Sequence, residues 1–124
     1  MTLLYKQESY KIQGAIFEVY KEIGTGYLEA IYQESLEKEL ALSDILYQAQ
    51  KELTIHYKGV SLKQTYKPDL ICYNNIIIEL KAVKEIAPEH QAQILNYMKA
   101  TNIKLGLLVN FCSHPKVTIK RFIL

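Results

Sequence analysis

The sequence contains no tryptophan and only two cysteines, three prolines and five glycines among its 124 residues. Cys72 and Cys112 form no C-x-x-C pair and have no histidine pair nearby, which argues against a zinc site or a disulfide framework. No window approaches the roughly 20 consecutive apolar residues of a membrane span, and the first residues lack the long apolar segment of a signal peptide. We therefore expect a cytoplasmic protein with no membrane partner, in which both cysteines are reduced and fill the core.

A strong excess of one charge is also missing. The 15 lysine and arginine residues nearly balance the 13 aspartate and glutamate residues, so the net charge is +2. This balance suits a nucleic-acid-binding domain, a small-molecule enzyme or an adaptor equally well. With 49% hydrophobic residues and no repeat or low-complexity linker, the chain is expected to form a single domain over residues 1–124. Only local motifs can distinguish these functions.

Apolar residues recur at helical spacing in two N-terminal segments, which predicts helices over Ser9–Ile23 and Tyr27–Leu42. Gly24-Thr25-Gly26 interrupts the pattern and ends the first helix. Further along, Pro88 is suited to the first turn of a third helix, which we expect to extend to Thr101.

After Asp44, β-branched and aromatic residues predominate and indicate strands. The expected strands are Tyr47–Tyr57, Val60–Tyr73, Ile76–Val83, Lys104–Phe111 and Val117–Ile123, with turns at Lys58-Gly59 and Asn74-Asn75. The run Ile76-Ile77-Ile78 is apolar on both faces and predicts a central strand covered on both sides. The order α-α-β-β-β-α-β-β indicates an α/β fold in which helices flank a mixed sheet.

Charged residues interrupt this central strand. Glu79 and Lys81 are two residues apart, so they share a face, and a hairpin can bring Asp69 across to them. Two neighbouring carboxylates repel each other unless a cation neutralises them, and such hard oxygen ligands suit Mg²⁺ or Mn²⁺. A lysine beside the ion could orient an attacking water or stabilise charge on a phosphate.

The hairpin before Glu79 must be irregular for this cluster to form. If Asn74-Asn75 were a plain two-residue loop, Asp69 would lie opposite Leu80 and point away from Glu79, because a slip of one residue reverses the facing. We therefore predict a loop with an odd number of residues, or a bulge.

Three motifs carry a family resemblance. Pro68-Asp69 followed by Glu79-Leu80-Lys81 resembles the P-D…E-x-K signature of the PD-(D/E)XK nuclease superfamily. The segment Gly26–Tyr32 is similar to the G-x-x-E-x-x-Y motif of the bacterial GxxExxY protein family, a branch of that superfamily. Gln93 and Tyr97 resemble the Q-x-x-x-Y motif of RecB-type nucleases. The motifs occur in the family's order along nearly the whole chain.

The resemblance implies a restriction-endonuclease-like fold and a nuclease dependent on Mg²⁺ or Mn²⁺, with DNA as the first candidate substrate. Asp69 and Glu79 would hold the metal ion, with the backbone carbonyl of Leu80 as a third ligand. Lys81 would be the catalytic lysine, and Glu29 the acidic residue that the first core helix contributes.

On the third helix, the resemblance implies that Gln93 and Tyr97 support Lys81 or contact the nucleic-acid backbone. As an alternative, these two residues are simply part of a surface, and Glu79 and Lys81 form an ordinary salt bridge. The alternative function is a catalytically silent nuclease-like module that binds DNA or a protein partner. The sequence leaves a homo-oligomer open.

Overall fold

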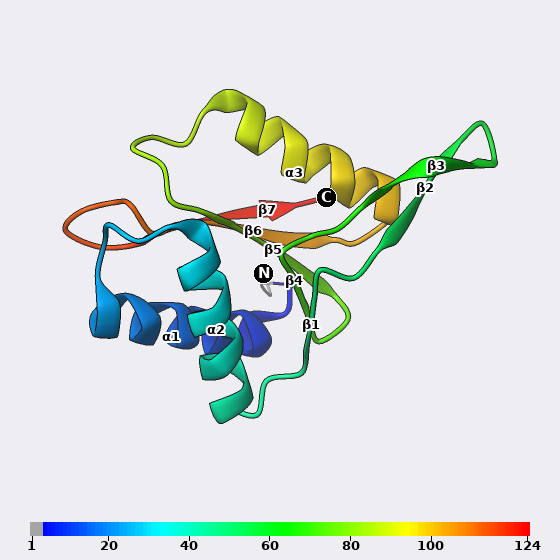
Figure 1. Cartoon of the computed structure of the whole chain (residues 1–124). Helices are drawn as coiled ribbons and strands as arrows, with labels where there is room; N and C mark the ends of the chain where they lie inside the picture. Colours follow the sequence, from blue (N-terminus) through cyan, green and yellow to red (C-terminus); the bar gives the residue numbers. More distant parts are fainter. Residues whose placement is uncertain (1–3) are drawn as a thin grey trace.

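The computed structural model describes residues 4–124, in which helices cover both faces of a five-stranded sheet and a separate two-stranded hairpin extends from it (Figure 1). The helices are α1 (Lys6–Ile23), α2 (Glu29–Leu42) and α3 (Pro88–Thr101). The strands are β1 (Tyr47–Ala49), β2 (Leu53–Tyr57), β3 (Val60–Tyr66), β4 (Leu70–Cys72), β5 (Ile76–Lys81), β6 (Leu105–Asn110) and β7 (Thr118–Ile123). The expected α/β class, a mixed sheet flanked by helices, is confirmed.

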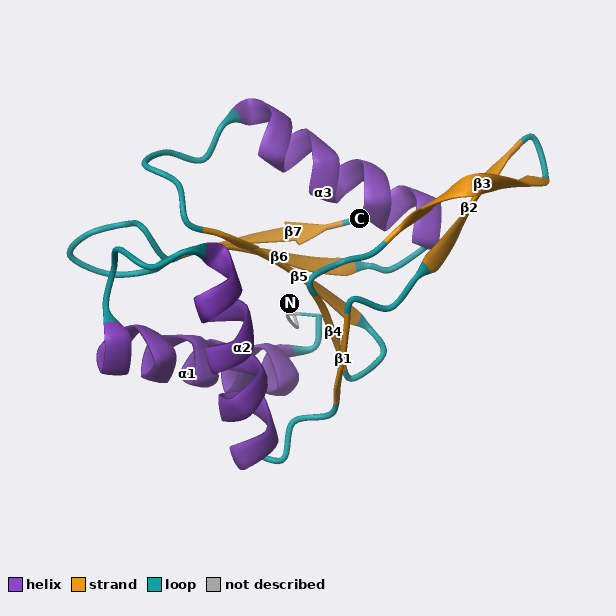
Figure 2. Cartoon of the chain, viewed as in Figure 1, coloured by secondary structure: helices purple, strands orange, loops and turns teal. Residues whose placement is uncertain are grey.

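The sheet has the order β1-β4-β5-β6-β7, and β2 pairs only with β3. Strands β5 and β6 run parallel, and the other neighbours in the sheet run antiparallel. Parallel strands require a crossover, and α3 supplies it between β5 and β6. In Figure 2 the helices α1 and α2 lie together on one side of the sheet, and α3 lies on the other.

The protein has two apolar cores, one on each face of the sheet, and strand β5 contributes residues to both. Ile76, Ile77 and Ile78 are completely buried, as expected for a strand covered on both faces. Ile76 and Ile78 pack with the apolar residues of α1 and α2, whereas Ile77 packs with Ile94 and Met98 of α3. Because alternate residues of a strand face opposite sides, Glu79 and Lys81 belong to the α3 face of the sheet.

The sequence predicted single strands over Tyr47–Tyr57 and Val60–Tyr73, and this prediction was wrong, because each is divided into two strands. Gln50 adopts a left-handed backbone conformation, with φ of 55°, which turns the chain out of the sheet. Pro68 has no N–H with which to continue a ladder, and the chain rejoins the sheet only at Leu70. The outer halves form the β2–β3 hairpin instead.

Both predicted turns are present, with different lengths. Lys58 and Gly59 have φ of 49° and 80° and close a two-residue turn of the I′ kind between Tyr57 and Val60. The second turn includes Tyr73 as well as the two predicted asparagines, because Cys72 pairs with Ile76. This loop has three residues.

The first two helices begin at other residues than expected. The first helix begins at Lys6, three residues before the expected Ser9. The second helix begins at Glu29 rather than Tyr27, because Gly26 has φ of 104° and Leu28 is extended. None of the helices in residues 4–124 is long and apolar enough to cross a membrane. Both cysteines are free, as expected; burial raises the pKa of the Cys72 thiol to about 12, whereas Cys112 is partly exposed rather than in the core.

Candidate functional site

Asp69 and Glu79 come together because of the register between β4 and β5. Leu70 pairs with Ile78, so the residue before Leu70 lies opposite the residue after Ile78. The predicted odd-numbered loop is thus confirmed, and the two acidic residues share the same face. Asp69 Oδ2 accepts a hydrogen bond of 2.7 Å from the backbone N–H of Leu80. Strand β4 begins only at Leu70. At the preceding position, the Asp69 carboxylate therefore accepts the hydrogen bond that a backbone carbonyl of a longer β4 would accept.

Glu79 is held by an aromatic residue that sequence analysis did not identify. The hydroxyl of Tyr66 donates a hydrogen bond to Glu79 Oε1. The ring of Tyr66 is stacked on that of Tyr97 of α3, with centroids 3.6 Å apart and an interplanar angle of 2°. Tyr97, which the sequence proposed as a supporting residue, is thus connected to Glu79 through Tyr66. A tyrosine two residues before a proline carries no signal of such a role.

The surroundings of Glu79 make its negative charge costly. Burial, followed by repulsion from Asp69, raises the pKa of the Glu79 carboxyl to about 7, although Tyr66 and Lys81 lower it. Burial and the nearby charge of Glu79 also raise the pKa of the Tyr66 hydroxyl, so Tyr66 remains a proton donor in this hydrogen bond. The carboxylate pair therefore favours an added positive charge, which a proton or a metal ion could provide.

Lys81 ends β5, and a buried asparagine anchors the backbone just beyond it. Asn110 of β6 lies beside Lys81 in the parallel pair and is only 2% exposed. Its Oδ1 accepts hydrogen bonds of 3.1 Å from the N–H groups of Val83 and Cys112, and its Nδ2 donates one of 2.8 Å to the Val83 carbonyl. Asn110 thereby fixes the chain two residues after Lys81. No local sequence pattern indicates this role of Asn110, because its partner Val83 is 27 residues away.

Glu29, the first residue of α2, lines a hollow of about 210 Å³ together with Asp69 and Leu80. From the same helix, Gln33 Nε2 donates a hydrogen bond of 2.9 Å to the backbone carbonyl of Asp69. The spacing of Glu29 and Gln33, one helical turn apart, could have suggested a shared face. These contacts join the start of α2 to the edge of the sheet that carries Asp69.

The last residue of the G-x-x-E-x-x-Y motif has a structural role. Tyr32 is completely buried, and its ring stacks on Phe111 with centroids 4.3 Å apart. Its hydroxyl donates a hydrogen bond of 2.5 Å to the carbonyl of Gly24, in the loop before α2. Tyr32 therefore holds the loop that determines where α2 begins, and with it the position of Glu29.

Gln93 does not join the carboxylates. Its side chain is exposed on α3 and lines a different hollow, of about 590 Å³, with Tyr97 and neighbouring helix residues. Within residues 4–124 the side chain of Gln93 makes no hydrogen bond to Lys81. Of the Q-x-x-x-Y pair, only Tyr97 reaches the surroundings of Glu79.

The donor set suits a metal ion bound by two carboxylates. Among the described residues, no three histidine, cysteine, aspartate or glutamate side chains come close enough together to hold one ion, so Glu29 does not complete a three-carboxylate group. Mg²⁺ keeps several waters and is commonly bound through one or two carboxylates together with substrate phosphates. Asp69 and Glu79 fit that requirement.

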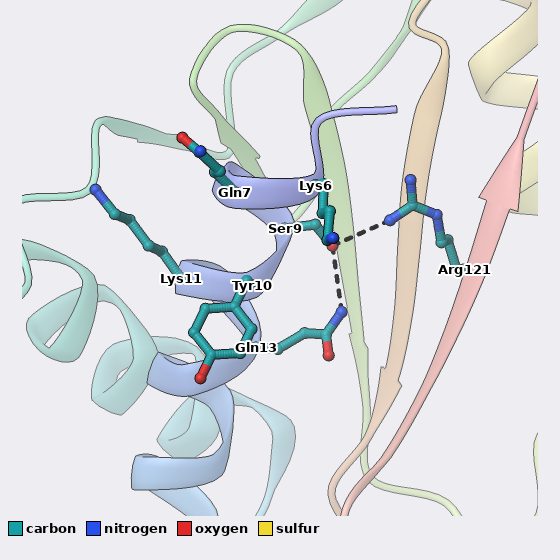
Figure 3. Close-up of a pocket in the computed structure, with 7 residues that line it drawn as sticks. All are labelled: Lys6, Gln7, Ser9, Tyr10, Lys11, Gln13 and Arg121. Atoms are coloured by element: carbon teal, nitrogen blue, oxygen red, sulfur yellow. Dashed lines mark hydrogen bonds between the residues drawn. The ribbon is translucent and has the colours of Figure 1, made fainter. Parts of the chain in front are cut away.

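A hollow of about 420 Å³ lies away from the carboxylates, beside the first half of α1 (Figure 3). Arg121 of β7 reaches into it and donates a hydrogen bond of 3.3 Å to Ser9 Oγ, which also accepts one of 3.2 Å from Gln13 Nε2. The lining residues are Lys6, Gln7, Ser9, Tyr10, Lys11, Gln13 and Arg121. None of these has a carboxylate, so this hollow offers no comparable metal ligands.

Comparison with known protein families gives one match. The family model described as the PD-(D/E)XK nuclease superfamily matches residues 6–122. No curated protein matches the chain significantly.

Solved structures resemble the fold. The crystal structure of SSO0001 is similar with a TM-score of 0.60 at 20% identity, over 76% of this chain and 48% of the other. An alkaline exonuclease (LHK-Exo) from Laribacter hongkongensis is similar with a TM-score of 0.52 at 14% identity, over 99% of this chain and 72% of the other. The chain thus spans about half the length of SSO0001. These likenesses support the expected restriction-endonuclease-like fold.

Proposed function

Because the chain belongs to the PD-(D/E)XK nuclease superfamily, we propose that it is a nuclease that hydrolyses nucleic-acid phosphodiester bonds with Mg²⁺ or Mn²⁺. The observation that carries the proposal is the register of β4 and β5, in which Asp69 lies opposite Glu79 and Lys81 follows on the same face. We propose DNA as the substrate. The GxxExxY branch is part of the proposal, supported by the placement of Glu29 beside Asp69.

Each residue has a proposed role. Asp69 and Glu79 hold the metal ion, with the backbone carbonyl of Leu80 as a further ligand, and Glu29 acts from the adjoining hollow. When bound, the ion polarises the phosphate and lowers the pKa of water, the two contributions that such ions make to hydrolysis. Lys81 stabilises negative charge that develops on the phosphate oxygens.

Three further residues have supporting roles in the proposal. Tyr97 keeps the Tyr66 ring in place by stacking, and Tyr66 orients Glu79. Gln93, exposed on the same helix as Tyr97, is available to contact the nucleic-acid backbone.

The reaction is ordinary hydrolysis, in which a water oxygen bonds to phosphorus, the bond to the leaving oxygen breaks, and that oxygen gains a proton.

The second candidate is a catalytically silent module that binds DNA or a protein partner. It is favoured by the present engagement of both carboxylates, Asp69 with the Leu80 N–H and Glu79 with the Tyr66 hydroxyl. A silent module would bind nucleic acid or a protein without any effect of Mn²⁺.

Incubation of the purified protein with Mn²⁺ and a panel of single- and double-stranded DNA and RNA tests the choice. We expect cleavage that EDTA stops and that Lys81→Ala abolishes, which also excludes a contaminating nuclease. Binding of DNA by the wild type without cleavage of any substrate would reject the nuclease and favour the silent module.

A further inference from the structure

The β2–β3 hairpin extends away from the rest of the molecule in Figure 1, past the end of α3. We call residues 51–67, which include this hairpin, the arm. Its base is packed, because Leu53, Ile55 and Tyr66 join the apolar core on the α3 face. The remainder of the arm is exposed, including Tyr57 at 62% and Val60 at 66%.

The arm contains the net positive charge of the chain. It includes four lysines and one glutamate, a net charge of +3, whereas the whole chain has +2 and the remaining residues therefore have −1. Its lysines, all exposed, are Lys51, Lys58, Lys63 and Lys67. The single acidic residue, Glu52, accepts a hydrogen bond of 3.0 Å from Thr65 near the base. No acidic side chain accompanies the lysines farther out.

The base of the arm adjoins the candidate site. Strand β3 ends at Tyr66, whose hydroxyl bonds to Glu79, and the chain continues through Lys67 and Pro68 to Asp69. From Tyr66 to Val60 the strand covers six residue steps, or about 20 Å at about 3.3 Å per residue. This length equals about six base pairs of duplex DNA at about 3.4 Å each. A substrate held at Asp69 and Glu79 could therefore lie along the whole arm.

We propose that the arm binds the phosphate backbone of the nucleic acid next to the bond that is cleaved. This inference rests on the proposed function, because it places the substrate at Asp69 and Glu79. Lys58 at the tip and Lys63 on β3 supply the charge, and Lys67 supplies it close to the carboxylates. A two-stranded ribbon of this kind is narrow enough to enter the major groove of DNA.

Exposed lysines on a hairpin have another established use. They prevent unpaired strand edges from joining those of other molecules, and such lysines would protect solubility without binding anything. The two roles differ in what they predict for lysine removal. Without edge protection the protein should self-associate, whereas without phosphate binding by the arm its affinity for DNA should fall and depend less on salt.

The test compares the full chain with the double variant Lys58→Gln and Lys63→Gln. The probe is a fluorescein-labelled DNA duplex of 24 base pairs, titrated in EDTA so that no cleavage occurs. We expect the Kd of the variant to rise by about tenfold or more near 0.1 M salt. The slope of log K against log salt should become shallower by about 1.8, or about 0.9 for each phosphate that the variant no longer neutralises.

The matched control is the double variant Lys11→Gln and Lys38→Gln, which removes two exposed lysines from α1 and α2. Its Kd and slope should equal those of the wild type. Circular dichroism checks the fold of each variant, and the single variant Lys63→Gln serves if the double variant does not fold.

Two results would overturn the inference, and they are distinguishable. If the wild type binds DNA and the arm variant binds it equally well, or only self-associates, the arm has no role in binding and the nuclease proposal stands. If the wild type does not bind the duplex even at low salt, the arm proposal fails, and the proposed function fails with it only if no single- or double-stranded substrate is cleaved in Mn²⁺.

Discussion

At the scale of single residues, Glu79 has a carboxyl whose ionisation opposes folding. Burial first, and then the charge of Asp69, raise its pKa from 4.5 to about 7. A group whose pKa is raised on folding stabilises the protein below its unfolded pKa, and this contribution disappears as the pH rises through the folded pKa. The stabilising contribution of Glu79 should therefore be lost between about pH 4.5 and pH 7.

A pH series of urea unfolding in EDTA tests this point. The wild type should lose on the order of 3 kcal/mol from Glu79 between pH 4.5 and pH 8, since each pKa unit corresponds to about 1.4 kcal/mol. Glu79→Gln, which cannot ionise, should lack this part of the slope. Parallel pH profiles for the two proteins would contradict the assigned cause.

Asp69 provides a second test, because the metal site and a simple salt bridge predict opposite signs. In the metal site, Asp69→Asn relieves repulsion with Glu79 and keeps an oxygen for the Leu80 N–H, so the metal-free variant should be as stable as the wild type or more stable. Mn²⁺ at ten times its Kd should stabilise the wild type by roughly 1.4 kcal/mol and the variant hardly at all.

The salt-bridge alternative has a different outcome for the same measurement. If Asp69 were only a buried partner of Lys81, its neutralisation should cost about 3–5 kcal/mol with or without metal. A strongly destabilised variant, together with a wild type that does not respond to Mn²⁺, would end the catalytic assignment of Asp69.

Tyr66 should affect Glu79 through its hydroxyl alone. Tyr66→Phe keeps the ring stacked on Tyr97 but removes a donor to a carboxylate, and should cost about 1–3 kcal/mol in free energy of unfolding above pH 7. Since the Tyr66 hydrogen bond lowers the pKa of Glu79, the variant should also shift that titration upward. The matched control Tyr97→Phe keeps the same stack and should change neither quantity.

At the scale of structural elements, two hairpins with different turns determine the site and the arm. The three-residue loop over 73–75 joins β4 to β5 and puts Asp69 on the face of Glu79. The two-residue turn at Lys58-Gly59 joins β2 to β3 at the end of the arm. Lysine is an unfavourable residue at a positive φ, because its Cβ approaches the backbone there.

Lys58→Asn tests the arm as an element. Asn-Gly is the preferred sequence for a type I′ turn, so the substitution should stabilise the arm by about 0.5–1 kcal/mol. Amide hydrogen exchange in β2 and β3 should become slower, while DNA binding weakens because a positive charge is removed. Faster exchange would show that Lys58 supports the turn in some other way.

At the scale of the whole molecule, nucleic-acid affinity should come mainly from contacts to the phosphate backbone and vary little with sequence, because the proposed contacts are made by lysines and phosphate contacts carry no sequence information. Lys67 and Lys84, both exposed and close in sequence to Asp69 and Lys81, should contribute together with the arm. Affinity for unrelated DNA sequences should be similar and should fall steeply between about 50 and 200 mM salt. Affinity that ignores salt would favour a protein partner.

Local sequence patterns predicted the three helices, the central strand and the residues of the P-D…E-x-K motif, although α1 and α2 begin at other residues than expected. These features depend on local spacing, as in the run Ile76-Ile77-Ile78, which predicted a strand covered on both faces and is completely buried. The odd number of residues in the loop between β4 and β5 was also predicted, because side chains of a strand alternate between its two faces and Asp69 had to share a face with Glu79. The cytoplasmic location and the single domain over residues 1–124 stay predictions.

The other features of the site could not be predicted, because they depend on contacts between residues far apart in the chain. Tyr66 reaches Glu79 across 13 residues, and Gln33 reaches Asp69 across 36. The separate arm exists because Gln50 bends and Pro68 cannot pair, and neither residue type alone specifies such a break. The position of Glu29 also depends on a tertiary contact, because Tyr32 packs into the core and holds the loop before α2 through its hydrogen bond to the Gly24 carbonyl. Local patterns identify which side chains carry charge, but only packing determines which of them meet.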